Sequence, residues 1–292
     1  MKVAVLGATG TVGRAVVPLL AQDHDVLAVS RRPHESTTGV RWAAADATDS
    51  AAVADVLSGI DVAYYLVHSL GSRDFERRDR LAAETVAREA ARAGVRQLVY
   101  LGGLGDDSPA LSRHLRSRAE TADVLASGAV PVTTLRAAMI VGSGSAAFET
   151  IVALADRLPA MLCPRWVSTR TQPIGIDDVA AYLAAAAGRE VMLGRSFDAG
   201  GPEVMTYRNM IERVAAIRGR RPLIVQVPIL TPRLSSYWLH LVTPVQASVA
   251  RPLIEGLRNE TVSRDDELRQ LIPRRLTSFE DAARAAMNGA AG

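Results

Sequence analysis

The chain has 292 residues, of which 48% are hydrophobic and 22% charged, and its formal net charge is +3. This length and apolar content predict a globular protein with a substantial core and exclude a largely disordered chain. The small net charge gives no indication of nucleic-acid binding. The single cysteine, Cys163, excludes internal disulfides and offers no framework for a metal site.

No segment approaches the roughly 20 apolar residues that a membrane-spanning helix requires. The longest apolar run, VAAYLAAAA, covers only Val179–Ala187. Met1 leads directly into an apolar strand without a basic leader segment. We therefore expect a cytoplasmic protein with no transmembrane segment, and the sequence carries no indication of its oligomeric state.

Apolar runs alternate with helical patterns along the first half of the chain, which is typical of parallel βαβ units. Between Phe75 and Ala93 apolar residues recur at helical spacing and stop before Gly94, so a helix is expected there. The predicted strands are Lys2–Leu6, Asp25–Ser30, Val40–Ala44, Val62–Leu66, Gln97–Leu101 and Pro131–Ala137. This alternation predicts an α/β fold with a Rossmann-like, doubly wound parallel sheet.

After Val141 the pattern loosens, and prolines interrupt a segment rich in loops. A helix is expected to start near Asp177, and Thr206 is a good N-cap for a second helix that follows a strand and a turn. We expect one unit over residues 1–292, in which residues 1–141 supply most of the sheet. Residues 142–292 are expected to form a smaller α/β lobe with a helical tail.

The sequence GATGTVG connects the first predicted strand to a helix and places glycine at positions 7, 10 and 13. Gly7 allows a tight turn, Gly10 leaves room for a phosphate, and Gly13 lets helix and strand pack closely. Backbone N–H groups and the positive end of the helix dipole would then bind a pyrophosphate. The residues predicted to bind a dinucleotide here are Gly7, Ala8, Thr9, Gly10, Thr11, Val12 and Gly13.

The end of the second predicted strand indicates which dinucleotide is preferred. NAD-binding proteins usually place an acidic residue there for the ribose hydroxyls, but this chain has Ser30, Arg31 and Arg32. A guanidinium group matches a 2′-phosphate, so we expect NADP(H) to be favoured over NAD(H). The alternative is an arginine pair in an exposed turn.

GATGTVG resembles the TGATGxxG loop of extended and atypical short-chain dehydrogenases/reductases. The segments YYLVHSLGSRDF, VYLGGLGDDSPALSRHLRSRAE and LRAAMIVGSGSAAFE are similar to the NmrA-like branch, which is related to the accessory subunit of respiratory complex I. The resemblance covers roughly residues 1–227. It implies a dinucleotide-binding core over residues 1–141 and a substrate lobe over residues 142–292. It also implies that Asp46 and Ala47 touch the adenine, and that Val67 and His68 lie beside the nicotinamide ribose.

The catalytic pattern of that family is not retained. Ordinary members use a serine after the fifth strand and a Tyr-x-x-x-Lys pair on the next helix. Gly102 and Gly103 stand at the serine position, while HLRSRAE places His114 at the tyrosine and Arg118 at the lysine. Arg118 could contact the cofactor but stays protonated. His114 could exchange a proton, although a helix-surface histidine without a role is the alternative.

Several further residues are candidates for a substrate pocket over the carboxyl ends of the strands. They are Tyr65, His68, Ser69, Met139 and the loop Gly142–Glu149, which could equally be a flexible connection. Tyr237 and Trp238 lie in a short apolar stretch. This stretch could be a packed helix, a pocket lid, a subunit interface or a peripheral membrane contact.

These features lead to the hypothesis of an NADP(H)-dependent oxidoreductase that transfers hydride to a small or lipophilic carbonyl or quinone. The proton would come from His114, His68 or water, and no metal is expected. The alternative is a non-catalytic protein that senses NADPH or supports a complex, as some members of the branch do. A nucleotide-sugar epimerase or dehydratase is less favoured, because such enzymes normally need the same Tyr/Lys pair.

Overall fold

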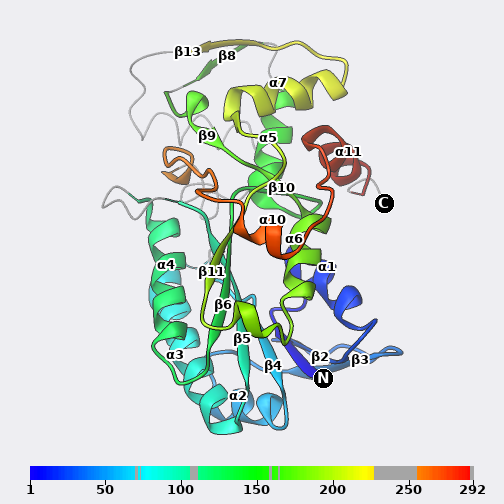
Figure 1. Cartoon of the computed structure of the whole chain (residues 1–292). Coiled ribbons are helices and arrows are strands. Elements are labelled where there is room, and N and C mark those ends of the chain that lie inside the picture. The colour runs from blue at the N-terminus through cyan, green and yellow to red at the C-terminus, as the bar shows by residue number, and fades with distance from the viewer. Residues whose placement is uncertain are drawn as a thin grey trace.

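A seven-stranded parallel sheet forms the centre of the molecule (Figure 1). The computed structural model describes residues 1–69, 72, 74–105, 111–157, 160–163, 165–226 and 255–289, so the Tyr237–Trp238 segment lies outside the described residues. The strand order is β11-β6-β5-β4-β1-β2-β3. The chain therefore reverses direction across the sheet between β1 and β4, which is the topological switch point of a doubly wound fold. The predicted fold class is confirmed.

The strands of this sheet follow the predicted ones closely. They are β1 (Lys2–Leu6), β2 (Asp25–Ser30), β3 (Val40–Ala44), β4 (Val62–Tyr65), β5 (Gln97–Gly103), β6 (Val132–Ala137) and β11 (Ser196–Ala199). The fourth strand ends one residue before the prediction, and the fifth extends two residues further. Because β1, β4 and β5 are buried on both faces, their sequences are nearly continuous apolar runs.

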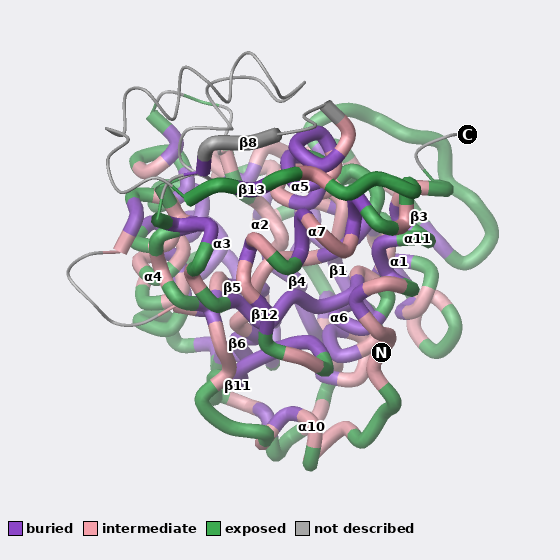
Figure 2. Tube along the Cα trace, turned by 90° about the horizontal axis from the view of Figure 1, so that it is seen from above, coloured by how far each residue is buried: buried purple, intermediate pink, exposed green. Residues whose placement is uncertain are grey.

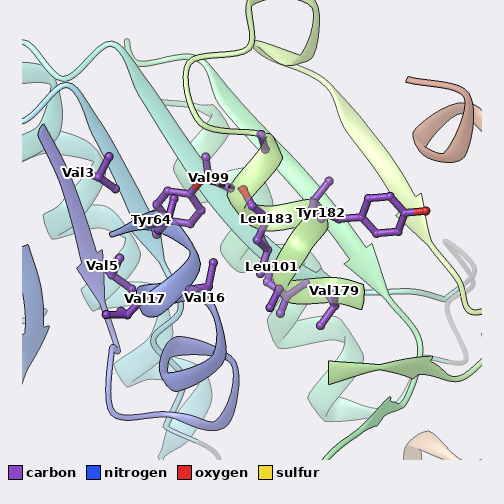
Figure 3. Packing of buried hydrophobic residues seen from close by; sticks show 14 of the residues in the cluster. Val3, Val5, Val16, Val17, Tyr64, Val99, Leu101, Val179, Tyr182 and Leu183 are labelled. Carbon is purple, nitrogen blue, oxygen red and sulfur yellow. Dashed lines mark hydrogen bonds between the residues drawn. The ribbon is translucent and has the colours of Figure 1, made fainter. Parts of the chain in front are cut away.

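Helices cover both faces of the sheet (Figure 1). On one face lie α1 (Thr11–Leu20) and α6 (Ile176–Ala185), and on the other α2 (Ser50–Leu57), α3 (Phe75–Ala93) and α4 (Arg113–Ala126). The core under α1 and α6 surrounds Tyr64, whose hydroxyl donates to the Leu183 carbonyl at 2.7 Å (Figure 3). The predicted helix at Phe75–Ala93 is confirmed, and Gly94 ends it in the left-handed conformation at φ 71°.

A second lobe sits above the carboxyl ends of the sheet (Figure 1). Its helices are α5 (Ala146–Arg157), α7 (Tyr207–Ile217) and α11 (Phe279–Gly289), with a short 3₁₀ turn at Arg165–Ser168. The short helix α10 (Glu267–Leu271) packs against β11 of the main sheet, and a second 3₁₀ turn, Glu190–Met192, connects α6 to β11. Its strands pair as β7 (Ile140–Val141) with β10 (Ile174–Gly175), β8 (Ala160–Cys163) with β13 (Leu223–Gln226), and β9 (Arg170–Thr171) with β12 (Met205–Thr206). The expected N-cap is confirmed, because the Thr206 side chain accepts from the Asn209 N–H in a capping box.

The second half of the chain also contributes to the main sheet. β11 pairs with β6, and a buried ion pair joins them, since the Arg136 guanidinium donates to the fully buried Asp198 carboxylate at 2.8 Å. Buried residues follow the strands through the middle of the molecule, whereas β13 is mostly exposed (Figure 2). Among the described helices, none is long and apolar enough to cross a membrane.

Candidate functional site

A cavity of about 870 Å³ runs along the carboxyl ends of the central strands. Its floor consists of the segments that follow these strands: Leu6–Val12 except Ala8, Val29–Arg31, Ala45–Thr48, Leu66–Ser69, Gly102–Leu104 and Ala137–Ile140. The second lobe closes the cavity from above. Open α/β sheets bind their ligands in this crevice, and the volume is within the range of a pocket for a small molecule or cofactor.

The glycine loop has the shape that a pyrophosphate needs. Gly7 has φ +89°, and a Cβ atom there would lie 2.7 Å from the Leu66 carbonyl oxygen. A Cβ atom at Gly13 would lie only 2.3 Å from the Gly7 carbonyl oxygen, so helix α1 can pack this closely only on glycine. Gly10 lines the cavity directly before the first turn of α1, whose N–H groups have no partner within the helix. These residues fit a dinucleotide.

Two of the predicted loop residues support the site instead of lining it. Ala8 is 1% exposed, belongs to the core, and donates its N–H to the Val29 carbonyl at 3.1 Å. Ala8 does not line the cavity, and its contact with a cofactor stays a prediction. Gly13 does not line the cavity either, although it has the packing role that the sequence predicted. Which residues of a tight turn are buried and which line the cavity depends on the three-dimensional path of the backbone.

Arg31, Asp46 and Ala47 all line the end of the cavity where the adenine is expected. Arg32 does not line the cavity, and its backbone instead bonds to the Ser30 hydroxyl. Burial opposes ionisation of Asp46, but hydrogen bonds from Thr48 and the charges of Arg78 and Arg31 outweigh it and lower the pKa of this carboxyl.

Arg78 was not among the predicted site residues. It lies on α3 and also lines the cavity, and its guanidinium donates to the Asp46 carboxylate at 2.6 Å. The carboxylate at the adenine end is thus already neutralised by a cation of the chain itself. No local motif marks this pair, because its members are 32 residues apart.

At the other end of the cavity, helix α4 faces the segment that follows β4. His114 and Arg118 of α4 line the cavity together with Val67, His68 and Ser69. The structure therefore brings together the residues predicted near the nicotinamide.

Arg118 is held in place by the end of β5. Its guanidinium donates to the Leu101 carbonyl and stacks over the Tyr100 ring at 5.1 Å. The Tyr100 hydroxyl in turn donates to the Arg118 carbonyl at 3.0 Å. A permanent positive charge is thereby fixed in the wall of the cavity.

Both histidines are neutral at neutral pH. Burial and the charge of Arg118 lower the pKa of His68 to about 4. Burial, Arg118 and His68 lower the pKa of His114 to about 3. His68 is exposed and lines the cavity, whereas His114 is half-buried. Each neutral imidazole retains one N–H donor, whereas an imidazolium acid is not available here.

The glycine at the end of β5 lies against α4. A Cβ atom at Gly103 would lie 2.9 Å from the Leu115 side chain, so a serine there would displace this leucine. The glycine that stands at the serine position thus lies against the same helix, α4, that carries His114 and Arg118.

The second lobe supplies a largely apolar wall. The residues that line it are Met139, Ile140, Ala146, Ala147, Thr150, Ile151, Tyr207, Leu257 and Thr261. Part of the loop Gly142–Glu149 lines the cavity as expected, and the Thr11 hydroxyl donates to the Gly144 carbonyl at 2.8 Å. Sequence reasoning missed Tyr207, Leu257 and Thr261, which reach the cavity only through the fold of the second lobe.

Tyr65 was predicted to line the pocket, and this is wrong. Neighbouring residues of a strand point to opposite faces, so Tyr64 packs under α1 and α6 while Tyr65 packs under α2 and α3. Tyr65 is fully buried there, and its hydroxyl lies 3.5 Å from the Asp79 carbonyl oxygen.

A glycine-rich turn at the switch point of a doubly wound sheet, below a large crevice, defines a dinucleotide-binding protein of the Rossmann class. Residues 7–159 match the family described as NAD(P)H-binding, and the chain belongs to this family. The resemblance to NAD(P)-binding proteins that the sequence indicated is confirmed.

Named relatives agree with this assignment. The chain is 30% identical over 227 residues to a "(4-alkanoyl-5-oxo-2,5-dihydrofuran-3-yl)methyl phosphate reductase" of Streptomyces griseus, covering 74% of this chain and 73% of the relative. It is 23% identical to "NADH dehydrogenase [ubiquinone] 1 alpha subcomplex subunit 9, mitochondrial" of Arabidopsis thaliana, covering 77% of this chain and 60% of that one. The NADPH complex of "NADPH-dependent quinone oxidoreductase QOR2" of Escherichia coli has the same fold, with a TM-score of 0.79 at 20% identity over 98% of this chain and all of that one.

Proposed function

We propose that this protein is an NADP(H)-dependent oxidoreductase that reduces a small or lipophilic carbonyl or quinone. The observation that carries the proposal is one continuous cavity, which joins the glycine loop to the apolar wall of the second lobe. When bound, the reduced nicotinamide supplies the hydride. Met139, Ile151 and Leu257 line the part of the cavity in which an apolar substrate would lie. The reductase name of the Streptomyces griseus relative supports the reaction type.

The residues at the nicotinamide end can stabilise the oxygen that gains negative charge during reduction. Arg118 remains charged and is oriented by Tyr100 and the Leu101 carbonyl. The neutral imidazole of His114 can donate one N–H toward the same space. Fixed donors of this kind lower the energy of a developing oxyanion. A quinone needs a strong acid less than a ketone does, because its reduced form is itself acidic.

The preference for NADP(H) is supported by the charges at the adenine end. Arg31 lines the cavity there. Asp46 is already paired with Arg78, so its charge neither repels a 2′-phosphate nor is free to bind ribose hydroxyls. Arg31→Ala should weaken NADPH binding by about 10- to 150-fold, since a charge-assisted contact contributes about 1.5–3 kcal/mol. NADH affinity should change little.

Arg32→Ala is the matched control for this measurement, because Arg32 is adjacent and exposed but does not line the cavity. Its NADPH affinity in calorimetric titration should stay within about twofold of the wild type. Equal losses of NADPH and NADH affinity in Arg31→Ala would contradict the 2′-phosphate assignment.

Turnover is tested by mixing the protein with NADPH and a panel of quinones and alkyl ketones, and by following the absorbance of the reduced cofactor. We expect oxidation that becomes faster with more apolar acceptors. Tight NADPH binding without turnover would refute the reductase and support a non-catalytic sensor or complex subunit. That second candidate is favoured by the missing serine at Gly103 and by the neutral histidines.

A further inference from the structure

Asp79 is a buried carboxylate that the reaction described above does not use. It lies on α3, is 4% exposed, and its Oδ1 atom has no hydrogen-bond partner in the structure. An unpaired polar atom in the interior costs free energy. Such groups are enriched at functional sites, where their protonation is part of the chemistry.

The position of Asp79 connects it to the cavity. The α3 residues Arg78 and Ala82, one position before and three after it, both line the cavity, so Asp79 lies directly behind this wall. Ser69 lines the cavity beside His68. Ser69 lies near enough to the Asp79 carboxyl for its hydroxyl and backbone N–H to lower the pKa of this carboxyl, while Oδ1 itself is left without a hydrogen-bond partner. Ser69 is therefore the polar group between Asp79 and the cavity.

The electrostatics around Asp79 differ from those around the histidines. Burial raises the pKa of the Asp79 carboxyl, although hydrogen bonding from Ser69 and the charges of Arg118 and Arg78 oppose this effect. Tyr65 of β4 and Tyr100 of β5 face the same carboxyl, and burial raises the pKa of both phenols, so they stay neutral.

His68 and His114, by contrast, have lowered pKa values, so their protonated imidazolium forms are disfavoured. Asp79 is the group at this end of the cavity, within the described part of the chain, in which burial favours the protonated form over the charged one.

We propose that Asp79 and Ser69 form the proton relay of this site, an inference that rests on the proposed reductase function. As the carbonyl carbon accepts the hydride, the C=O π bond breaks and the substrate oxygen takes the proton of the Ser69 hydroxyl. The Ser69 oxygen takes the proton of the Asp79 carboxylic acid. The resulting carboxylate is stabilised by Arg118 and Arg78, and it regains a proton from water in the cavity after the product leaves. Hydride and proton together convert the ketone into an alcohol.

The relay is tested with Asp79→Asn and Ser69→Ala, using an alkyl ketone and NADPH. Each variant should lower kcat by about 100-fold, the effect expected on removing a general acid, while NADPH affinity in calorimetry stays within about twofold. In the wild type, kcat should fall as the pH rises through the titration of Asp79, and this limb should be absent from both variants. Retention of the wild-type kcat or of this limb in Asp79→Asn or Ser69→Ala would overturn the relay.

Glu89→Gln is the matched control, because Glu89 is on the same helix, its side chain is 3% exposed, and it pairs with Arg88 and Arg92 outside the cavity. It should leave kcat and the pH profile unchanged. A loss in Glu89→Gln equal to that in Asp79→Asn would assign the effect to helix packing and overturn the relay.

A readout that does not need turnover is the infrared band of a protonated carboxylic acid. The wild type should show this band near neutral pH, and Asp79→Asn should lose it while Glu89→Gln keeps it. Its absence from the wild type at the pH of maximal turnover would refute the relay. If the wild type oxidises no NADPH with any acceptor, the reductase proposal fails, and the band still reports separately on Asp79.

Discussion

Replacing single glycines of the phosphate loop by alanine should separate folding from cofactor binding. Gly10→Ala and Gly13→Ala add the same methyl group at two positions that are three residues apart. At Gly13 that methyl would meet the Gly7 carbonyl oxygen at 2.3 Å and the Ala8 Cα at 2.7 Å, both of them backbone atoms. At Gly10 the nearest atom is 3.2 Å away, and the backbone is extended, at φ −70° and ψ 166°.

Gly13→Ala should mainly lower thermal stability, whereas Gly10→Ala should mainly weaken NADPH binding. Overpacking against backbone costs about 1–3 kcal/mol, and each kcal/mol lowers Tm by about 2–4 °C in a chain of this size. Gly13→Ala should therefore melt about 2–12 °C below the wild type. Gly10→Ala loses only a favourable N-cap residue, about 1 kcal/mol or less. Its methyl, however, occupies the approach of the phosphate and should weaken NADPH binding by about 10- to 150-fold.

Thermal denaturation and calorimetric titration with NADPH check both halves of this prediction. A Gly13→Ala protein that melts within about 1 °C of the wild type would show that the helix can move away from the loop at little cost. A Gly10→Ala protein with wild-type NADPH affinity would show that the phosphate does not pass over this residue. Either result would refute the reasoning from loop geometry.

Two further outcomes follow from charged and titratable groups. Folding lowers the pKa of His68 to about 4 and that of His114 to about 3, against about 6.5 for a histidine in an unfolded chain. At pH values between these limits, the unfolded state therefore binds more protons than the folded state. The free energy of unfolding should thus be highest above about pH 6.5 and fall toward pH 4. In urea denaturation, the double variant His68→Gln/His114→Gln should lose less of this free energy over the same pH range. Arg136→Met should destabilise the protein by about 3–5 kcal/mol, because the buried Asp198 carboxylate loses the guanidinium at its Oδ1 and keeps the Arg264 N–H at Oδ2; an unchanged urea midpoint would contradict this.

The fold was predictable because its signals are local. Each strand of the main sheet is a short apolar run bounded by turn residues, and the glycine loop is encoded within seven consecutive positions. The error at Tyr65 was avoidable, since adjacent residues of a strand cannot both face the same side. Tyr64 and Tyr65 belong to different layers of the core.

The candidate site was predictable only in part because its remaining walls depend on distant contacts. Arg78 reaches Asp46 from another helix. Thr261 arrives beside Thr171 through a hydrogen bond between their hydroxyls at 2.7 Å, across 90 residues of sequence. Asp79 is one of several acidic residues in a charged helix, and what distinguishes it is burial together with an Oδ1 atom that has no partner. No spacing rule along the chain encodes such pairs.

The bond between the Thr11 hydroxyl and the Gly144 carbonyl joins segments 133 residues apart. Gly144 adopts φ +78°, and a Cβ atom there would lie 3.2 Å from the Arg14 guanidinium and 3.3 Å from the Thr11 hydroxyl. Exchanging residues 142–289 for those of a relative with different substrates would therefore succeed only if the graft brought a glycine to this junction and met a hydroxyl at position 11. For protein engineers, this pair is one of the contacts, together with the Arg136–Asp198 ion pair, that a chimera joined at this position has to retain.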